Sequence, residues 1–270
     1  MNNDEGKKTR NRYDRIIERV FTRHSAEGTE GFEFSREEIA DIAAELDIKL
    51  PKNLGDVIYT YRYRRELPRA IVEAAPPGKT WSILPAGVGR YRFVAEVPLL
   101  LQPTRDLAET KVPDATPGLI ALYALSDEQA LLAKLRYNRL IDIFTGVTCC
   151  SLQNHLRTTV PDFGQIETDE IYVGVDRRGA HYVFPVEAKA AREKLGSIQI
   201  RQDLWLCKSR FPNLICRPIG AQLMKNDVIA LFEFVEEANG IKIASEKHYR
   251  LVPPRDMSPE DLEAYRHRLD

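Results

Sequence analysis

The sequence predicts an α/β protein with two domains: a small helical domain that ends in a β-hairpin, and a larger domain built on a mixed sheet flanked by helices. Apolar residues at helical spacing dominate the region before residue 75, and strand-like segments dominate residues 151–189. Between them, prolines at positions 98, 103, 113 and 117 interrupt a stretch without periodicity. We therefore expect domains at residues 1–97 and 119–270, joined by a linker at 98–118.

The composition excludes several classes of protein. Hydrophobic residues make up 43% of the 270 residues, and no apolar run approaches the length of a membrane span. The polar N-terminal segment lacks the apolar stretch of a secretory signal, so we expect a cytoplasmic protein with no membrane partner. The four cysteines have no CxxC spacing and no histidine at zinc-ligand spacing, so we expect reduced thiols: Cys149, Cys150, Cys207 and Cys216.

Three helices and a hairpin are predicted in the first domain. The elements are helices at residues 13–21, from Ser35 onward and at 54–74, then strands near 81–84 and 91–97. Ser35 and Glu38 form a capping box, and Pro68 must bend, end or restart the third helix. Three helices followed by a hairpin resemble a winged helix-turn-helix domain, in which the third helix and the hairpin contact DNA.

Basic residues concentrate in the third helix and the hairpin. Residues 60–92 contain seven lysines and arginines but only two acidic residues, Glu66 and Glu73, an excess of five positive charges. Although the whole chain has a formal net charge of −1, a concentrated basic face matters more for phosphate binding than the total does. The alternative is a solvated face used for protein contacts. The predicted contacts with double-stranded DNA are Arg62, Arg64, Arg65, Arg69, Lys79, Arg90 and Arg92.

The second domain is predicted to combine helices with a series of strands. Its elements are a helix from Ser126 to about Gly146, strands at 151–160, 164–175 and 180–189, a helix at 197–209, strands at 214–219 and 228–235, and a helix from Ser258. The segment from Asp176 to Gly179 has the residues of a type I turn closed by a left-handed glycine, which joins two strands into a hairpin.

That turn fixes a register in which paired residue numbers sum to 356. Glu187 then lies opposite Asp169, and Lys189 lies opposite Glu167, with all four side chains on one face. Clustered carboxylates repel one another unless a cation neutralises them, and Mg²⁺ prefers oxygen ligands of this kind. The pattern therefore predicts a magnesium site suited to phosphodiester hydrolysis.

An acidic residue on one strand, Asp169, followed by Glu187-Ala188-Lys189 on the next, resembles the PD-(D/E)xK nuclease superfamily, which includes most type II restriction endonucleases. The resemblance covers about residues 119–250. It implies a restriction-endonuclease-like fold, metal binding by Asp169 and Glu187, and assistance of the attacking water by Lys189. It also makes Glu128, on the preceding helix, and Gln199, on the following helix, candidates for the site. Glu167 is a further candidate metal ligand because of the register.

Several alternatives stay open at this stage. The literal Pro-Asp pair is Pro161-Asp162, so Asp162 competes with Asp169 as the main ligand, and Pro185 interrupts the E-x-K strand. We expect a Mg²⁺-dependent DNA endonuclease, of restriction type by resemblance, and a homodimer if it cuts palindromes. A winged-helix regulator with a non-catalytic nuclease-like domain, or a structure-selective repair or recombination nuclease, are the other interpretations.

Overall fold

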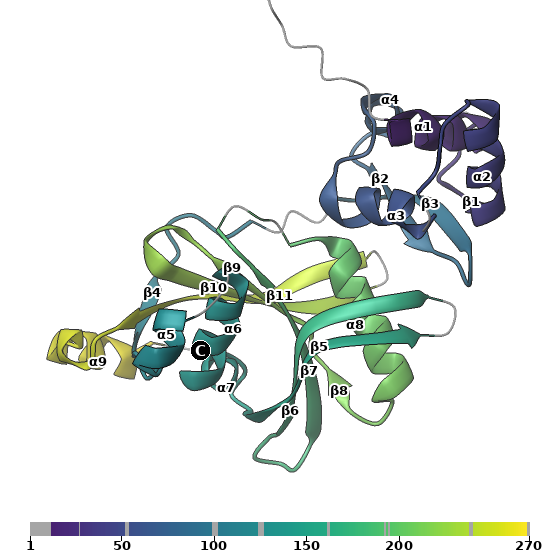
Figure 1. Ribbon diagram of the computed structural model, residues 1–270. Coiled ribbons are helices and arrows are strands. Elements are labelled where there is room, and N and C mark those ends of the chain that lie inside the picture. The colour runs from purple at the N-terminus through teal and green to yellow at the C-terminus, as the bar shows by residue number, and fades with distance from the viewer. Residues whose placement is uncertain are drawn as a thin grey trace, which may run out of the picture. The chain divides into compact units, whose positions relative to one another are not determined.

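The protein is an α/β molecule with a mixed multistranded sheet flanked by helices (Figure 1). The structure, a computed structural model, describes residues 12–26, 28–51, 54–98, 102–123, 127–160, 163–191, 193, 195–237 and 240–268. The chain divides into two compact units, one formed by Met1–Pro98 with Pro161–Gly164 and the other by Leu99–Val160 with Gln165–Asp270. Within the described ranges, no helix has both the length and the apolar character needed to cross a membrane.

The N-terminal unit combines short helices with a three-stranded sheet. Its elements are α1 (Arg12–His24), β1 (Gly31–Ser35), α2 (Arg36–Glu45), α3 (Gly55–Tyr59), the π-helical turn η1 (Thr60–Arg64), α4 (Arg69–Glu73), β2 (Thr80–Pro85) and β3 (Arg90–Glu96). The strands are antiparallel in the order β1-β3-β2. Phe21 meets Trp81 and Phe93 edge to face, at centroid distances of 5.2 and 5.3 Å, in the core that joins α1 to this sheet.

Local chemistry explains where these elements begin and end. The Ser35 side chain accepts a hydrogen bond from the Glu38 N–H at the start of α2, as predicted. The helix predicted over residues 54–74 is interrupted near Pro68, as expected: the chain leaves the helix at Arg65 and restarts at Arg69, after Pro68. Arg65 therefore lies outside the third helix. The strand β1 was not predicted, since its five residues carry no turn signal that separates them from α2.

The C-terminal unit is built on an eight-stranded sheet. Its elements are β4 (Glu109–Pro113), α5 (Gly118–Tyr123), α6 (Asp127–Tyr137), α7 (Leu140–Thr145), β5 (Thr148–Val160), β6 (Gly164–Val175), β7 (His181–Lys189), α8 (Ser197–Arg210), β8 (Ile215–Cys216), β9 (Ile219–Leu223), η2 (Lys225–Asp227), β10 (Val228–Glu237), β11 (Gly240–Val252), η3 (Pro254–Asp256) and α9 (Pro259–Arg266). The strand order is β4-β11-β10-β9-β7-β6-β5, and β8 pairs with β7. The sheet is mixed because β7 runs parallel to β9 and antiparallel to β6.

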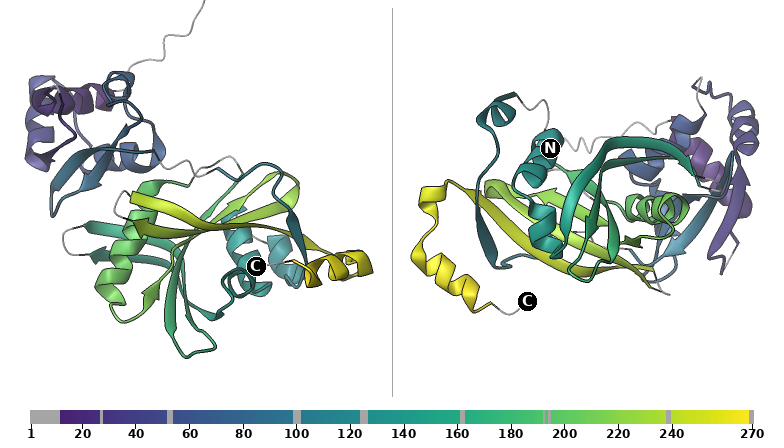
Figure 2. Two further views of the ribbon diagram at one scale, coloured as in Figure 1. Left: turned by 180° about the vertical axis from the view of Figure 1, so that it is seen from behind. Right: turned by 90° about the horizontal axis from the view of Figure 1, so that it is seen from below.

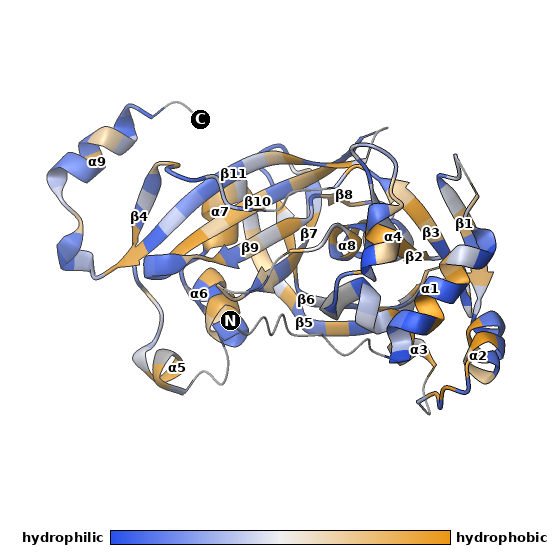
Figure 3. Cartoon of the chain, turned by 90° about the horizontal axis from the view of Figure 1, so that it is seen from above, coloured by the Kyte–Doolittle hydropathy of each residue, from blue (hydrophilic) through white to orange (hydrophobic). Residues whose placement is uncertain are grey.

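Helices cover both faces of this sheet (Figures 1 and 2). On β10, Ile229 and Leu231 pack with leucines of α6 and α7, whereas Phe232 and Phe234 pack with Ile200 and other side chains of α8. Alternate residues of a strand point to opposite faces, so the two clusters form two separate core layers. Figure 3 shows hydrophobic residues along β10 and on α6 and α7, with α9 mostly hydrophilic.

Several predicted boundaries of the C-terminal unit need correction. The expected linker contains β4, which pairs in parallel with β11, a strand that was also not predicted. The single helix expected before Gly146 is two helices, because Arg139 takes a left-handed conformation between them. Gly146 ends α7, as expected. Ser126, the expected helix cap, lies outside the described residues. The helix beginning after Ser258 is confirmed, with Ser258 and Asp261 forming a capping box.

Candidate active site

The hairpin of β6 and β7 has the predicted register. Its pairs run from Val175↔His181 to Glu170↔Val186, and each pair sums to 356. The Asp176 carboxylate accepts hydrogen bonds from the N–H groups of Arg178 and Ala180, and Gly179 has a φ of 82°. Turn chemistry therefore sets the register that delivers the acidic residues of β6 beside Glu187.

The regular pairing of β6 with β7 ends at Glu170↔Val186, next to the acidic residues of the candidate site. The N–H of Ala188 donates to the Asp169 side chain at 2.8 Å. Thr168 and Glu170 both flank Asp169, but Thr168 bonds to Asp203 of α8 while Glu170 bonds to Arg136 of α6. Strand β6 thus contacts α8 through Thr168, β7 through Asp169 and α6 through Glu170.

Glu187 is buried beneath α8. Only 2% of the residue is exposed, and Gln199 donates from Nε2 to its Oε2 at 3.0 Å. Glu187 is paired with Gly220 of β9, where an added Cβ would come within 2.7 Å of Leu195 Cδ1. The absence of a side chain at Gly220 lets the segment before α8 approach the sheet, which places Gln199 over Glu187.

Lys189 lies among three carboxylates. Its Nζ is 3.6 Å from Glu128 Oε1, 3.8 Å from Glu187 Oε2 and 3.9 Å from Asp169 Oδ2, and the side chain is 12% exposed. Burial by itself lowers the pKa of the Lys189 ammonium, but the carboxylates outweigh burial, and the pKa is raised. Lys189 therefore stays positively charged at neutral pH, and Glu128 joins the site from the first turn of α6.

Glu167 does not belong to this cluster. Its carboxylate instead contacts the Arg157 guanidinium at 3.0 Å, and its side chain is 39% exposed. The expected pairing of Glu167 with Lys189 is therefore corrected, because the regular register ends before it is reached. Asp162, the alternative ligand, lies outside the described residues.

Asp203 is a member of the cluster that the sequence analysis missed. It is fully buried on α8, one helical turn after Gln199, and its Oδ1 accepts from the Thr168 hydroxyl at 2.8 Å. The i, i+4 spacing of Gln199 and Asp203 was the available signal, because it puts both side chains on one face of the helix. Asp203 thus ties α8 to the residue that precedes Asp169.

The electrostatics of the cluster favour an added cation. Burial raises the pKa of Glu187 well above its ordinary value of 4.5, and the carboxylates of Asp203 and Asp169 raise it further. Burial also raises the pKa of Asp203, although the hydrogen bond from Thr168 opposes this effect. Glu187 Oε1 and Asp203 Oδ2 are buried without hydrogen-bond partners among the described residues. These oxygens are acceptors that a cation or a proton must satisfy.

The residues present fit a magnesium ion that keeps most of its water. Among the described residues, no three His, Cys, Asp or Glu side chains form a group able to hold a metal by themselves. Mg²⁺, however, is commonly held by one or two carboxylates together with water and substrate phosphate. Asp169 and Glu187 supply two carboxylates, and the free Oε1 of Glu187 supplies a ligand atom. These two residues would hold the ion.

The predicted basic residues of the N-terminal unit are largely paired with acids. Arg65 lies 3.9 Å from Asp14, Arg69 2.6 Å from Glu73, and Lys79 2.5 Å from Glu30. Arg90 and Arg92 both bind Glu33 of β1. The side chain of Arg62 is partly buried on η1, and that of Arg64 lies outside the description. The excess of five positive charges counted over residues 60–92 is therefore partly neutralised in the folded unit. Glu33 of the unpredicted strand β1, for example, lies beside Arg90 and Arg92 of the hairpin.

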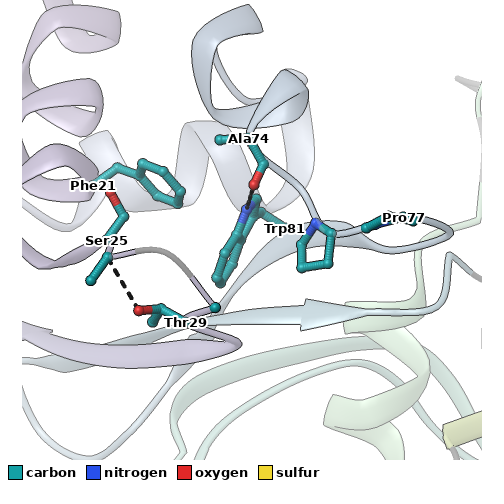
Figure 4. Close-up of a pocket in the computed structure, with 9 residues that line it drawn as sticks. Phe21, Ser25, Thr29, Ala74, Pro77 and Trp81 are labelled. Atoms are coloured by element: carbon teal, nitrogen blue, oxygen red, sulfur yellow. Dashed lines mark hydrogen bonds between the residues drawn. The ribbon is translucent and has the colours of Figure 1, made fainter.

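Comparisons of the chain with protein-family models, curated proteins and solved structures found no match. A cavity of about 500 Å³ in the N-terminal unit is a separate feature (Figure 4). It lies between the end of α1, the end of α4 and Trp81, whose indole N–H donates to the Ala74 carbonyl. Among the described residues that line it, none carries a charged side chain, so these residues offer no groups for hydrolytic chemistry. The acid–lysine cluster of the C-terminal unit is therefore the candidate site.

Replacing the buried acid should stabilise the protein in a pH-dependent way. A raised carboxyl pKa means that the folded state holds the proton more tightly, so the free energy of unfolding falls as pH rises above about 4.5. Glu187→Gln removes the titrating group and therefore this loss of stability. Its amide oxygen can still accept the hydrogen bond from Gln199. We expect the variant to match wild type near about pH 4 and to exceed it by about 1–3 kcal/mol near about pH 8 in metal-free buffer. Denaturant unfolding across pH measures this, with the exposed Glu263→Gln as control; equal stability of Glu187→Gln and wild type at both pH values would contradict it.

Proposed function

We propose that the protein is a Mg²⁺-dependent DNA endonuclease. The observation that carries the proposal is the convergence of Asp169, Glu187 and Lys189 at the end of one hairpin, with both carboxylates within 4 Å of the ammonium. Two carboxylates and a fixed positive charge are the groups that metal-assisted phosphodiester hydrolysis needs. Buried charges of this kind concentrate at functional sites.

The order of elements around the site supports the resemblance to PD-(D/E)xK nucleases. Helices α6 and α7 precede the strands β5, β6 and β7, and α8 then leads to β9, which lies beside β7. Asp169 is on β6, the E-x-K residues are on β7, Glu128 is on the helix before them, and Gln199 is on the helix after them. We accordingly propose a restriction-endonuclease-like fold for the C-terminal unit.

Each residue of the cluster has a distinct proposed role. When bound, Mg²⁺ supplies Lewis-acid polarisation of the phosphoryl oxygen and of the attacking water. Lys189 keeps its proton and stabilises negative charge that develops on the phosphoryl oxygens, so it does not act as the base. Gln199 fixes one oxygen of Glu187 and leaves the other for the ion. Asp203 accepts a hydrogen bond from Thr168, the residue before Asp169, and so helps to position Asp169.

The N-terminal unit supports a role in gripping DNA. We propose that this unit is a winged helix, because a helix and a strand are followed by three short helices, α2, α3 and α4, and then by the hairpin of β2 and β3, with β3 in the centre of the sheet. Arg90 and Arg92 lie on the same side of β3 in the hairpin, and Val88 at its tip is 93% exposed. In winged helices such a hairpin contacts the DNA backbone or the minor groove.

The biological role follows from resemblance to restriction enzymes. We propose duplex DNA as the partner, action in the cytoplasm, and a homodimer if the target is palindromic. A DNA-binding regulator with an inactive nuclease-like domain is the second candidate. The absence of a three-acid metal group among the described residues favours that candidate.

Cleavage assays separate the two candidates. With plasmid and phage DNA and Mg²⁺, we expect wild type to cut, and Asp169→Asn and Lys189→Ala each to lose at least about 100-fold in rate, because each removes charge stabilisation from the transition state. Glu167→Gln is the matched control, since its carboxylate pairs with Arg157 outside the cluster, and it should cut as wild type does. Tight DNA binding without cutting by wild type, across several divalent metals, would support the regulator instead.

Binding assays test the hairpin. Replacing Arg90 and Arg92 by alanine should weaken duplex binding and lower the slope of log affinity against log salt by about two, one for each lost phosphate contact. Glu33→Gln should do the opposite and tighten binding, because it frees both guanidinium groups from their acidic partner. Fluorescence anisotropy at several salt concentrations measures both, with Arg266→Ala on α9 as control. An unchanged slope in the double variant would exclude the hairpin from the DNA contact.

A further inference from the structure

A second polar cluster lies on the opposite face of β6 from the candidate active site. Glu170 follows Asp169 directly and is fully buried. Its Oε1 accepts from Arg136 Nε of α6 at 2.9 Å and from the Ser151 hydroxyl of β5 at 2.5 Å. Arg136 also donates to Asn154 Oδ1 at 3.0 Å. A buried carboxylate therefore holds the Arg136 guanidinium and the Asn154 amide in fixed positions.

A cavity of about 360 Å³ opens above this cluster. Arg136, Asn154 and Gln129 form its polar lining, and α5 and α6 supply aromatic and aliphatic walls that include Tyr123 and Tyr137. Tyr123 is 71% exposed and Tyr137 42% exposed, so both rings are available to a ligand. Fixed polar groups beside exposed aromatic rings are characteristic of a binding pocket for a flat molecule with a polar edge.

The charge balance of the pocket selects against a phosphate group. Arg136 is the only cation that lines it among the described residues, and its charge is already balanced by Glu170. The Asn154 Oδ1 accepts from Arg136, and its NH₂ group has no acceptor among the described residues, so it can donate to a ligand. Amide side chains pair with the edges of bases, and tyrosine and arginine stack on their faces. A neutral heteroaromatic ring fits this lining better than an anion does.

The pocket and the candidate active site share two backbone segments. Asp169 and Glu170 are consecutive on β6, with the first in the acid–lysine cluster and the second beneath the pocket. Glu128 and Gln129 are consecutive on α6, with the first beside Lys189 and the second in the pocket lining. The same two elements, β6 and α6, therefore supply residues to both sites.

We propose that this pocket binds a nucleobase of the DNA that the protein binds. That the base comes from DNA rests on the proposed nuclease function, whereas the binding of a base by the pocket rests on the pocket's own lining. The base leaves its stack, lies against Tyr123 or Tyr137, and meets Asn154 and Arg136 with its polar edge. Stacking on the tyrosine offsets part of the cost of unstacking. The pocket thereby gives the protein a preference for particular bases in the DNA that it binds.

Photo-crosslinking tests the pocket without requiring cleavage. The probe is a duplex of random sequence that contains 5-iodouracil, which cross-links to aromatic side chains in contact with it, and the buffer contains no Mg²⁺. We expect mass spectrometry to find the adduct on the peptide that carries Tyr123 or Tyr137. Tyr123→Ala and Asn154→Ala should lower its yield at least about fivefold, whereas Tyr123→Phe, which keeps the ring, should restore it. Leu122→Ala is the matched control, because Leu122 is 70% exposed on α5 but does not line the pocket.

The outcomes distinguish the proposal from the proposed function. Adducts found only outside α5 and α6, in a preparation that cuts DNA, overturn the pocket and leave the nuclease standing. Adducts in the pocket from a preparation that does not cut DNA would support the base site and contradict the proposed nuclease function. The same cross-linking with free 5-iodo-deoxyuridine monophosphate tests the source, since labelling by the monomer with none by the duplex assigns the pocket to free nucleotides. No labelling by either probe overturns a nucleobase site.

Discussion

The burial of the Glu187 carboxylate is the constraint on which the C-terminal unit depends. A carboxylate with 2% exposure is costly unless positive charge or hydrogen bonds compensate it. Gly220 lets the start of α8 come close, Gln199 satisfies one oxygen, and Lys189 supplies one positive charge. Asp169, Asp203 and Glu128 then add more negative charge than one ammonium neutralises. Well-packed apolar residues in place of these acids would often stabilise a protein more, so the cluster is a candidate functional site on physical grounds.

Strand β6 connects this cluster to the rest of the unit. Three successive side chains have different partners: Thr168 bonds to α8, Asp169 to β7 and Glu170 to α6. One strand thereby links the hairpin to a helix of each helical layer. The acid–lysine cluster and the polar pocket therefore depend on residues that are adjacent along β6.

The sequence predicted what depends on local chemistry. The turn at Asp176 fixed the hairpin register, and that register correctly placed Asp169, Glu187 and Lys189 together; Glu128 and Gln199 also reach the cluster. Contacts between distant segments were not predictable. Glu167 was misplaced because the ladder ends before it, and Asp203 was missed because its partner, Thr168, is 35 residues away. The basic hairpin looked unopposed because Glu33, 57 residues from Arg90, belongs to a strand with no sequence signal.

Direct titration with Mg²⁺, followed by calorimetry and by thermal unfolding, tests most directly whether the cluster is built around a cation. A charge-neutralising metal site predicts saturable binding to wild type, with a gain of about 2.7 kcal/mol in the free energy of unfolding at a concentration about 100 times Kd. Asp169→Asn and Glu187→Gln should remove both the binding and the gain. If Mg²⁺ stabilised wild type and both variants equally, or did not bind wild type at all, the buried acids would have to be explained without a metal.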